Sequence, residues 1–258
     1  MELDWTGIHW FAANMAAPLG AVLQKVRCWN EVANINLIPT VSYILARNGF
    51  LVNDGTPKQP DPFNTAMAFT CFGLHESDAF QEYVSRNLAD KELPAMTRQL
   101  RRKFLESLCE LFENAKLHSG TRHGVFACGQ HFPNKQRLDL AVCDLGIGIR
   151  EKVRAHRGAD ISPCDAIQWA FTGRNTTREG DIPGGVGLKV LREFVGKNNG
   201  SLHMVSDAGY YELRGSASRL RQLPDCFPGT VVNVSINTAD HALYYLSGAS
   251  TAEVLVAG

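Results

Sequence analysis

Between Thr97 and Leu117, apolar side chains return every three or four positions, which is the spacing of a helix with one buried face. Glu110, Asn114 and His118 follow one another at steps of four residues inside this segment. Four-residue steps stack side chains along a helix, so these three polar groups share one face. The apolar side collects Leu108, Leu111, Phe112 and Ala115. The segment therefore predicts a long helix whose polar face serves something other than the core.

The second half of the chain alternates strand-like and helix-like segments. Strands are predicted at 124–128, 138–144, 201–207, 210–213 and 229–236. Helices are predicted at 163–171, after an N-cap at Ser162, and at 187–198. Because DAGYY (207–211) predicts a tight turn, we expect an α/β fold, an α+β sandwich whose sheet is mixed or antiparallel with helices on one face.

The first fifty residues predict a small β-α-β-α unit. Its strands are expected at 3–10 and 32–37, and its helices at 16–26 and 39–49. After the turn-rich stretch NDGTPKQPDP, a strand at 64–72 and a helix at 77–89 are predicted. The chain then divides into an N-terminal unit (1–55), a connecting region (56–95), a main domain (96–240) and a tail (241–258).

Composition narrows the range of functions. Of the 258 residues 45% are hydrophobic, and 26 basic side chains balance 26 acidic ones, which gives no electrostatic reason to expect nucleic acid as a partner. The start, MELDWTG, lacks the basic and apolar regions of a secretory signal, and the longest uncharged run, 10–24, is too short to span a bilayer. We expect a cytoplasmic protein without membrane attachment. The seven cysteines show neither disulfide nor zinc spacing and are expected to be reduced.

A first glycine motif, DLGIGI, follows a predicted strand. Asp144 at the strand end offers a carboxylate to an amino group. Gly146 and Gly148 let the backbone turn sharply and approach a flat ligand, although a simple turn would have the same sequence.

A second glycine motif, GGVGLK, precedes an amphipathic helix. The free amides at Gly184, Gly185 and Gly187 and the helix dipole suit a phosphate chain. A dinucleotide fingerprint is disfavoured because Val190 stands where a glycine or alanine is needed and no strand comes before. P-loop and protein-kinase signatures are absent.

With Gly229-Thr230, these motifs form an ordered set over about 96–237 that resembles the GHKL ATPase superfamily. This superfamily includes type II topoisomerases, mismatch-repair proteins, the large heat-shock chaperone, sensor histidine kinases and anti-sigma serine kinases. Since NAKLHSG places His118 after the motif Asn114, the pattern is closest to the anti-sigma serine-kinase type.

The resemblance implies ATP and Mg²⁺ as ligands. Asn114 would coordinate Mg²⁺, and Glu110, one turn earlier, would be the general base. Asp144 would bind the adenine amino group, with Gly146 and Gly148 under the base. The further implied nucleotide contacts are Ile149, Gly184, Gly185, Val186, Gly187, Leu188 and Thr230.

A mobile lid over ATP is implied for residues 172–184. Its Thr176 and Thr177 would contact phosphates or only cap a turn. His118 would contact the ligand or only end its helix, where a cation is favoured. Pro183, where many relatives have glycine, would stiffen the hinge. Further candidates for the γ-phosphate are Arg174, Arg178 and Lys189.

The first fifty residues resemble part of a STAS domain, the βαβα fold of anti-sigma-factor antagonists. The stretch FAANMAAPLG has no Ser or Thr at the start of the helix, so this unit is not expected to accept phosphate. It would dock a protein partner, form a wall packed on the ATPase sheet, or contribute only to the core.

Three functions stay open. The first is an ATPase conformational switch in which Glu110 activates water, acting on a STAS-like or other signalling partner or across a homodimer. The second is a serine/threonine kinase of a STAS-like partner, and the third is a non-catalytic ATP-binding module, which would need no Glu110. A histidine autokinase is not expected, because too little helix surrounds His75.

Overall fold

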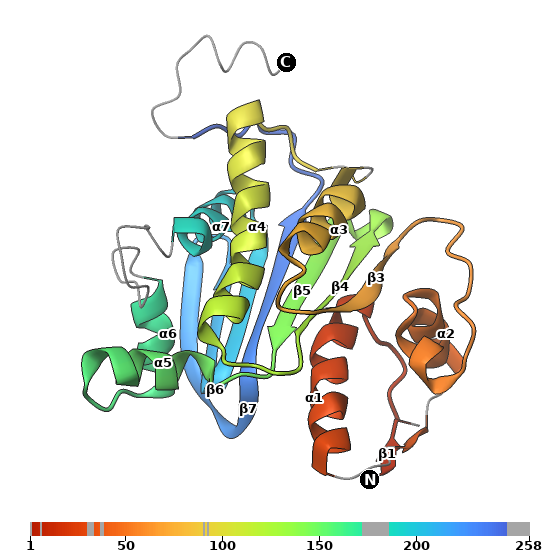
Figure 1. Cartoon of the computed structure of the whole chain (residues 1–258). Coiled ribbons are helices and arrows are strands. Elements are labelled where there is room, and N and C mark those ends of the chain that lie inside the picture. The colour runs from red at the N-terminus through yellow and green to blue at the C-terminus, as the bar shows by residue number, and fades with distance from the viewer. Residues whose placement is uncertain are drawn as a thin grey trace.

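The computed structural model describes residues 2–5, 7–29, 34–36, 39–89, 91, 93–171 and 186–246. A five-stranded sheet lies at its centre, and every neighbouring pair of strands is antiparallel (Figure 1). In spatial order its strands are β3 (Ala66–Phe72), β4 (Val125–Phe132), β5 (Arg137–Asp144), β7 (Ala217–Asn237) and β6 (Ser201–Arg214). The antiparallel form of the prediction is therefore confirmed.

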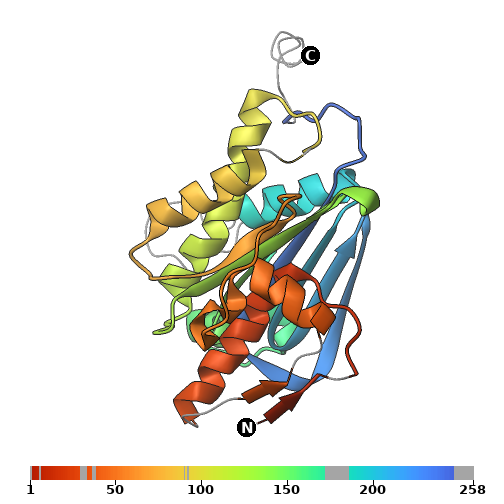
Figure 2. The same cartoon turned by 90° about the vertical axis from the view of Figure 1, so that its right-hand side faces the viewer.

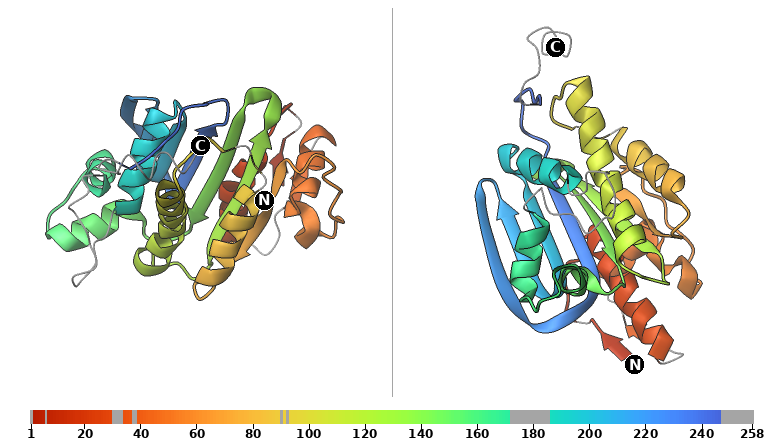
Figure 3. Two further views of the ribbon diagram at one scale, coloured as in Figure 1. Left: turned by 90° about the horizontal axis from the view of Figure 1, so that it is seen from above. Right: turned by 60° about the vertical axis from the view of Figure 1, so that its left-hand side comes forward.

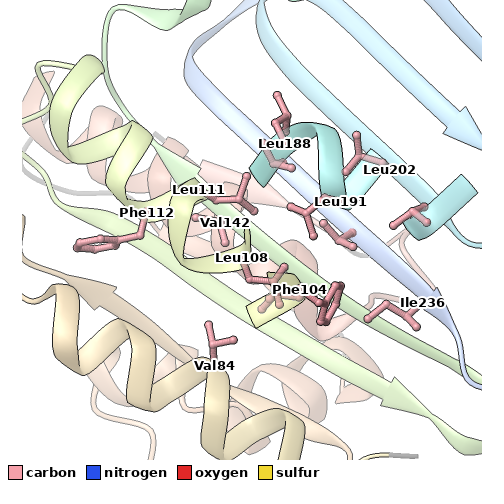
Figure 4. Packing of buried hydrophobic residues seen from close by; sticks show 14 of the residues in the cluster. Val84, Phe104, Leu108, Leu111, Phe112, Val142, Leu188, Leu191, Leu202 and Ile236 are labelled. Atoms are coloured by element: carbon pink, nitrogen blue, oxygen red, sulfur yellow. The ribbon is translucent and has the colours of Figure 1, made fainter. Parts of the chain in front are cut away.

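One face of the sheet, the helical face, packs against three helices. These are α3 (Ser77–Ala89), α4 (Arg98–His118) and α7 (Val186–Lys197). Figure 4 shows Phe104 and Leu108 of α4 beside Leu191 of α7, with Val142 and Ile236 of the strands close to them. The apolar side of α4 predicted from its spacing is thus the side that meets the sheet. Two shorter helices, α5 (Gly148–Arg157) and α6 (Pro163–Ala170), pack on each other and on β6.

The opposite face, the N-terminal face, is covered by the start of the chain. The predicted β-α-β-α order is confirmed: β1 (Glu2–Asp4) and β2 (Asn34–Asn36) are parallel, and α1 (Ala16–Trp29) and α2 (Pro39–Arg47) follow them in turn. In Figures 2 and 3, α1 and α4 lie on opposite sides of the sheet. The prediction of helices on one face of the sheet was therefore wrong, because α1 packs on the other face.

The N-terminal layer is joined to the sheet by packing and by hydrogen bonds. Its cluster of buried residues includes Phe126 and Cys143 of the sheet, which alternate with the residues of the helical face. The amide of Ala13 donates to Oε1 of Gln130 at 2.7 Å, and Nδ2 of Asn14 donates to Oδ1 of Asn233 at 2.7 Å. Of the roles considered for this segment, a wall packed on the sheet is the one observed.

Strands β6 and β7 differ most from the predicted pattern. The stretch 207–211 is no turn: β6 continues through it with register shifts at Asp207, whose φ is 51°. The two strands join at Gly215 instead, because Arg214 pairs with Ala217. Helix α5 was not predicted at all.

Local capping agrees with the sequence. Thr97 accepts a hydrogen bond from the amide of Leu100 at the start of α4, and Ser162 accepts one from Asp165 at the start of α6, as predicted. The seven cysteines form no disulfide. Within the described part of the chain, no helix combines the length and apolar content needed to cross a membrane.

Candidate functional site

On the helical face, three polar side chains form a row across neighbouring strands, next to rows of apolar side chains. Asp144 on β5 is the register partner of Thr230 on β7, which is the partner of Ser206 on β6. The preceding rows on the same face are apolar: Leu140, Val234 and Leu202, then Val142, Val232 and Met204. Side chains two positions apart share a face, so the polar row continues that face to one end of the sheet.

Asp144 is a buried carboxyl with fixed donors around it. Only 6% of its surface is exposed, and its Oδ1 accepts from the amide of Gly146 at 2.8 Å. Burial raises its pKa from 3.8 to about 7, while backbone donors at Gly146 and Thr230 act in the opposite direction. A buried carboxyl that changes charge near neutral pH marks a candidate functional site.

The turn after Asp144 lies against the end of α4. The amide of Ile147 donates to the carbonyl of Ser119 at 2.7 Å. A Cβ at Gly146 would lie 2.2 Å from the same carbonyl oxygen, so no larger residue fits. The DLGIGI motif therefore connects the end of β5 to the helix that carries Glu110, Asn114 and His118.

Gly148 and Ile149 connect the motif to β6. Gly148 has a φ of 75°, a conformation that favours glycine, and opens α5. The amide of Ile149 donates to Oγ of Ser206 at 2.8 Å. The polar row and the glycine turn thus form one hydrogen-bonded unit.

At the other end of the polar face of α4, Glu110 meets the first turn of α7. The amide of Gly187 donates to Oε2 of Glu110 at 2.7 Å, and a Cβ at Gly187 would lie 2.3 Å from that oxygen. An acidic side chain is favoured at a helix N-terminus by the helix dipole. Gly187 is therefore needed for the close approach of Glu110.

Asn114 and His118 lie between these two ends. Both are half-buried on α4, and His118 is the last residue of that helix. From Glu110 to Ser119 the helix rises about 13 Å, at 1.5 Å per residue. The polar face of α4 therefore spans the distance between Glu110 and the Asp144 turn.

The other predicted contacts have different outcomes. Leu188 packs its side chain into the core, so only its backbone is available to a ligand. Lys189 is exposed, 3.9 Å from Glu193. Val186 opens α7. The remaining predicted residues lie outside the described part of the chain: Arg174, Thr176, Thr177, Arg178, Pro183, Gly184 and Gly185.

A metal ion at this site would need oxygen ligands from a bound molecule and from water in addition to those of the protein. Among the residues that the structure describes, no three His, Cys, Asp or Glu side chains gather in a way that could hold a metal ion. Mg²⁺ is commonly held by one or two protein oxygens together with substrate phosphates and water. The amide oxygen of Asn114, on the polar face of α4, would be the protein ligand in such an arrangement.

Ser206 and Ser119 were missed by the sequence reasoning. Ser206 follows Leu202 and Met204 at steps of two, so strand alternation places it on the helical face. That alternation was a usable signal. The role of Ser119 depends on its backbone carbonyl, for which the sequence gives no signal.

The comparisons with known proteins leave the chain without an assigned family. No protein-family model matches it, and no curated protein is significantly similar.

Proposed function

We propose that the protein binds ATP with Mg²⁺ between α4, the DLGIGI turn and α7, and hydrolyses it as a conformational switch. The observation that carries the proposal is the polar face of α4, which links the buried Asp144 turn to Glu110 at the start of α7. An elongated ligand with a base at one end and phosphates at the other suits these two ends.

At the base end, Asp144 would accept a hydrogen bond from the exocyclic amine of adenine. Its carboxylate is already held by the amides of Gly146 and Thr230, so little reorganisation is needed on binding. Gly146 lies tightly against Ser119, which fixes the turn that donates to the carboxylate of Asp144.

At the phosphate end, Glu110 would take a proton from the attacking water. Mg²⁺ held by Asn114 would neutralise charge on the phosphates. The amide of Gly187 donates to Glu110. We therefore assign to Gly187 the positioning of the general base Glu110, in place of the phosphate contact expected from its motif.

A switch needs an element that responds to the ligand. Helix α7 begins at Val186, directly after the segment expected to be the lid, and its first turn is bonded to Glu110. Binding of phosphates near Glu110 would therefore change how the start of α7 is held.

The test is release of phosphate from Mg-ATP, with ATP affinity measured in parallel. We expect release by the wild type and a loss of about 100-fold or more in Glu110→Gln with affinity retained. Glu113→Gln is the matched control, since Glu113 pairs with Lys116 at 3.5 Å, and Lys116 donates to Ser77 of α3. ATP binding without release by the wild type would contradict hydrolysis, and no binding would contradict the whole proposal.

A further inference from the structure

Ser206 is a buried hydroxyl at the centre of the polar row, with no role in the proposed reaction so far. It is 1% exposed and lies on the helical face beside Thr230. Three groups are within hydrogen-bond distance of its Oγ: the amide of Ile149 at 2.8 Å, the carbonyl of Gly229 at 3.2 Å and Oγ1 of Thr230 at 3.1 Å.

When all three bonds form together, the chemistry of the partners fixes the direction of each bond. An amide can only donate and a carbonyl can only accept, and a serine hydroxyl has a single proton. Ser206 therefore accepts from Ile149 and gives its proton to Gly229. Its bond with Thr230 then requires the proton of Thr230, so that hydroxyl is left with acceptor lone pairs for any ligand.

The neighbouring strand supplies a second acceptor. Asp144 is the register partner of Thr230, and side chains at such positions have Cβ atoms about 5 Å apart. Asp144 already accepts from the amide of Gly146, and its ionised carboxylate can only accept. Two acceptors side by side can each accept a hydrogen bond from an amino group, which carries two N–H donors. A carbonyl oxygen has no proton to donate and would be repelled by both.

We infer that Ser206 is a positioning residue that makes the base end of the site selective for a purine carrying an exocyclic amine over one carrying a carbonyl. It acts through Thr230 and touches no ligand itself. This inference rests on the proposed nucleotide site and adds to it the residue that sets the hydrogen-bond direction of Thr230.

The experiment compares the affinities of ATP and inosine triphosphate, which share the ribose and the triphosphate. At pH 8, above the pKa of about 7 of Asp144, Ser206→Ala should lower the ratio of the two affinities by about tenfold. A purely structural defect would weaken both nucleotides alike and leave the ratio unchanged.

Two further variants keep the test decisive. Thr230→Val removes the hydroxyl on which Ser206 acts, so adding Ser206→Ala to it should change the ratio no further. This variant also tests the bond if Ser206→Ala does not fold. Ser235→Ala is the matched control, because Ser235 is a buried serine on β7 whose side chain lies on the other face of the sheet. It should leave the ratio as in the wild type.

The outcomes separate this inference from the function on which it rests. A wild type that prefers ATP, with an unchanged ratio in Ser206→Ala, or in Thr230→Val where Ser206→Ala does not fold, overturns the role of Ser206 alone. A wild type that binds neither nucleotide overturns the proposed function and this inference with it.

Discussion

At the Asp144 end of the candidate site, buried hydrogen bonds join β5, β6, β7 and the start of α5, whereas at the Glu110 end the amide of Gly187 on α7 donates to a side chain of α4. The first end is built on paired strands, and its turn is also bonded to Ser119 at the end of α4. The second changes whenever α4 and α7 move relative to each other. If the proposed function holds, the Asp144 end is the more rigid base end and the Glu110 end the more adjustable phosphate end, which suits coupling of hydrolysis to movement.

The largest expected effect concerns the charge of Asp144. The folded protein keeps a proton on this carboxyl up to pH about 7, whereas the ordinary value is 3.8. The unfolded chain binds fewer protons between these values, so the free energy of unfolding falls as pH rises through them. Asp144→Asn should therefore be more stable than the wild type by up to about 4 kcal/mol at pH 8, with the difference vanishing near pH 4.

Denaturant titrations from pH 4 to pH 8 measure this difference. A difference in the free energy of unfolding that stays constant with pH would mean that the pKa of Asp144 is not raised by burial. Burying this carboxyl at the base end would then not destabilise the folded protein.

Gly146→Ala should be the next largest effect. Its Cβ would meet the carbonyl of Ser119 at 2.2 Å, which is backbone and cannot move aside. We expect the free energy of unfolding to fall by about 2 to 3 kcal/mol. Gly7→Ala, with nothing within 4 Å of the added carbon, is the control and should change stability little. Equal stabilities of the two variants would show that the turn yields easily.

Gly187→Ala should separate stability from turnover. Its Cβ would displace the flexible end of Glu110, and alanine favours a helix, so the unfolding free energy should change by no more than about 1 kcal/mol. Phosphate release should fall at least as much as in Glu110→Gln, while ATP affinity changes little. Normal turnover would contradict the view that Gly187 positions the base.

The smallest effect is expected at Lys189. Its amine is exposed and lies 3.9 Å from Glu193, a spacing that contributes little in water. Lys189→Ala should leave stability within about 0.5 kcal/mol and ATP affinity within a factor of about two. A large loss of affinity would place the γ-phosphate nearer to α7 than proposed.

The regular parts of the fold were predictable from the sequence. Helix α3 lies at Ser77–Ala89 and α4 at Arg98–His118, within a residue of the expected segments, because caps and apolar spacing agree there. The first half of β7 was missed because its side chains are mostly exposed and include Pro224 and Pro228, which disfavour a strand assignment.

The site was predictable only in part. The shared face of Glu110, Asn114 and His118 follows from helical spacing alone. The bond between Gly187 and Glu110 and the seating of Gly146 on Ser119 depend on how distant segments pack, which no local pattern encodes. Packing of the N-terminal unit on the far face of the sheet was likewise only one of several roles that the sequence left open.

The most direct test of the account is a calorimetric titration of Mg-ATP into the wild type, Asp144→Asn and Asp139→Asn. Asp139 is the matched control, since it is an equally buried aspartate of β5 whose side chain lies on the other face of the sheet. We predict binding by the wild type and by Asp139→Asn, and an affinity lower by about 100-fold in Asp144→Asn, whose amide would oppose the adenine amine. Equal affinities for all three, or no binding by the wild type, would contradict the account.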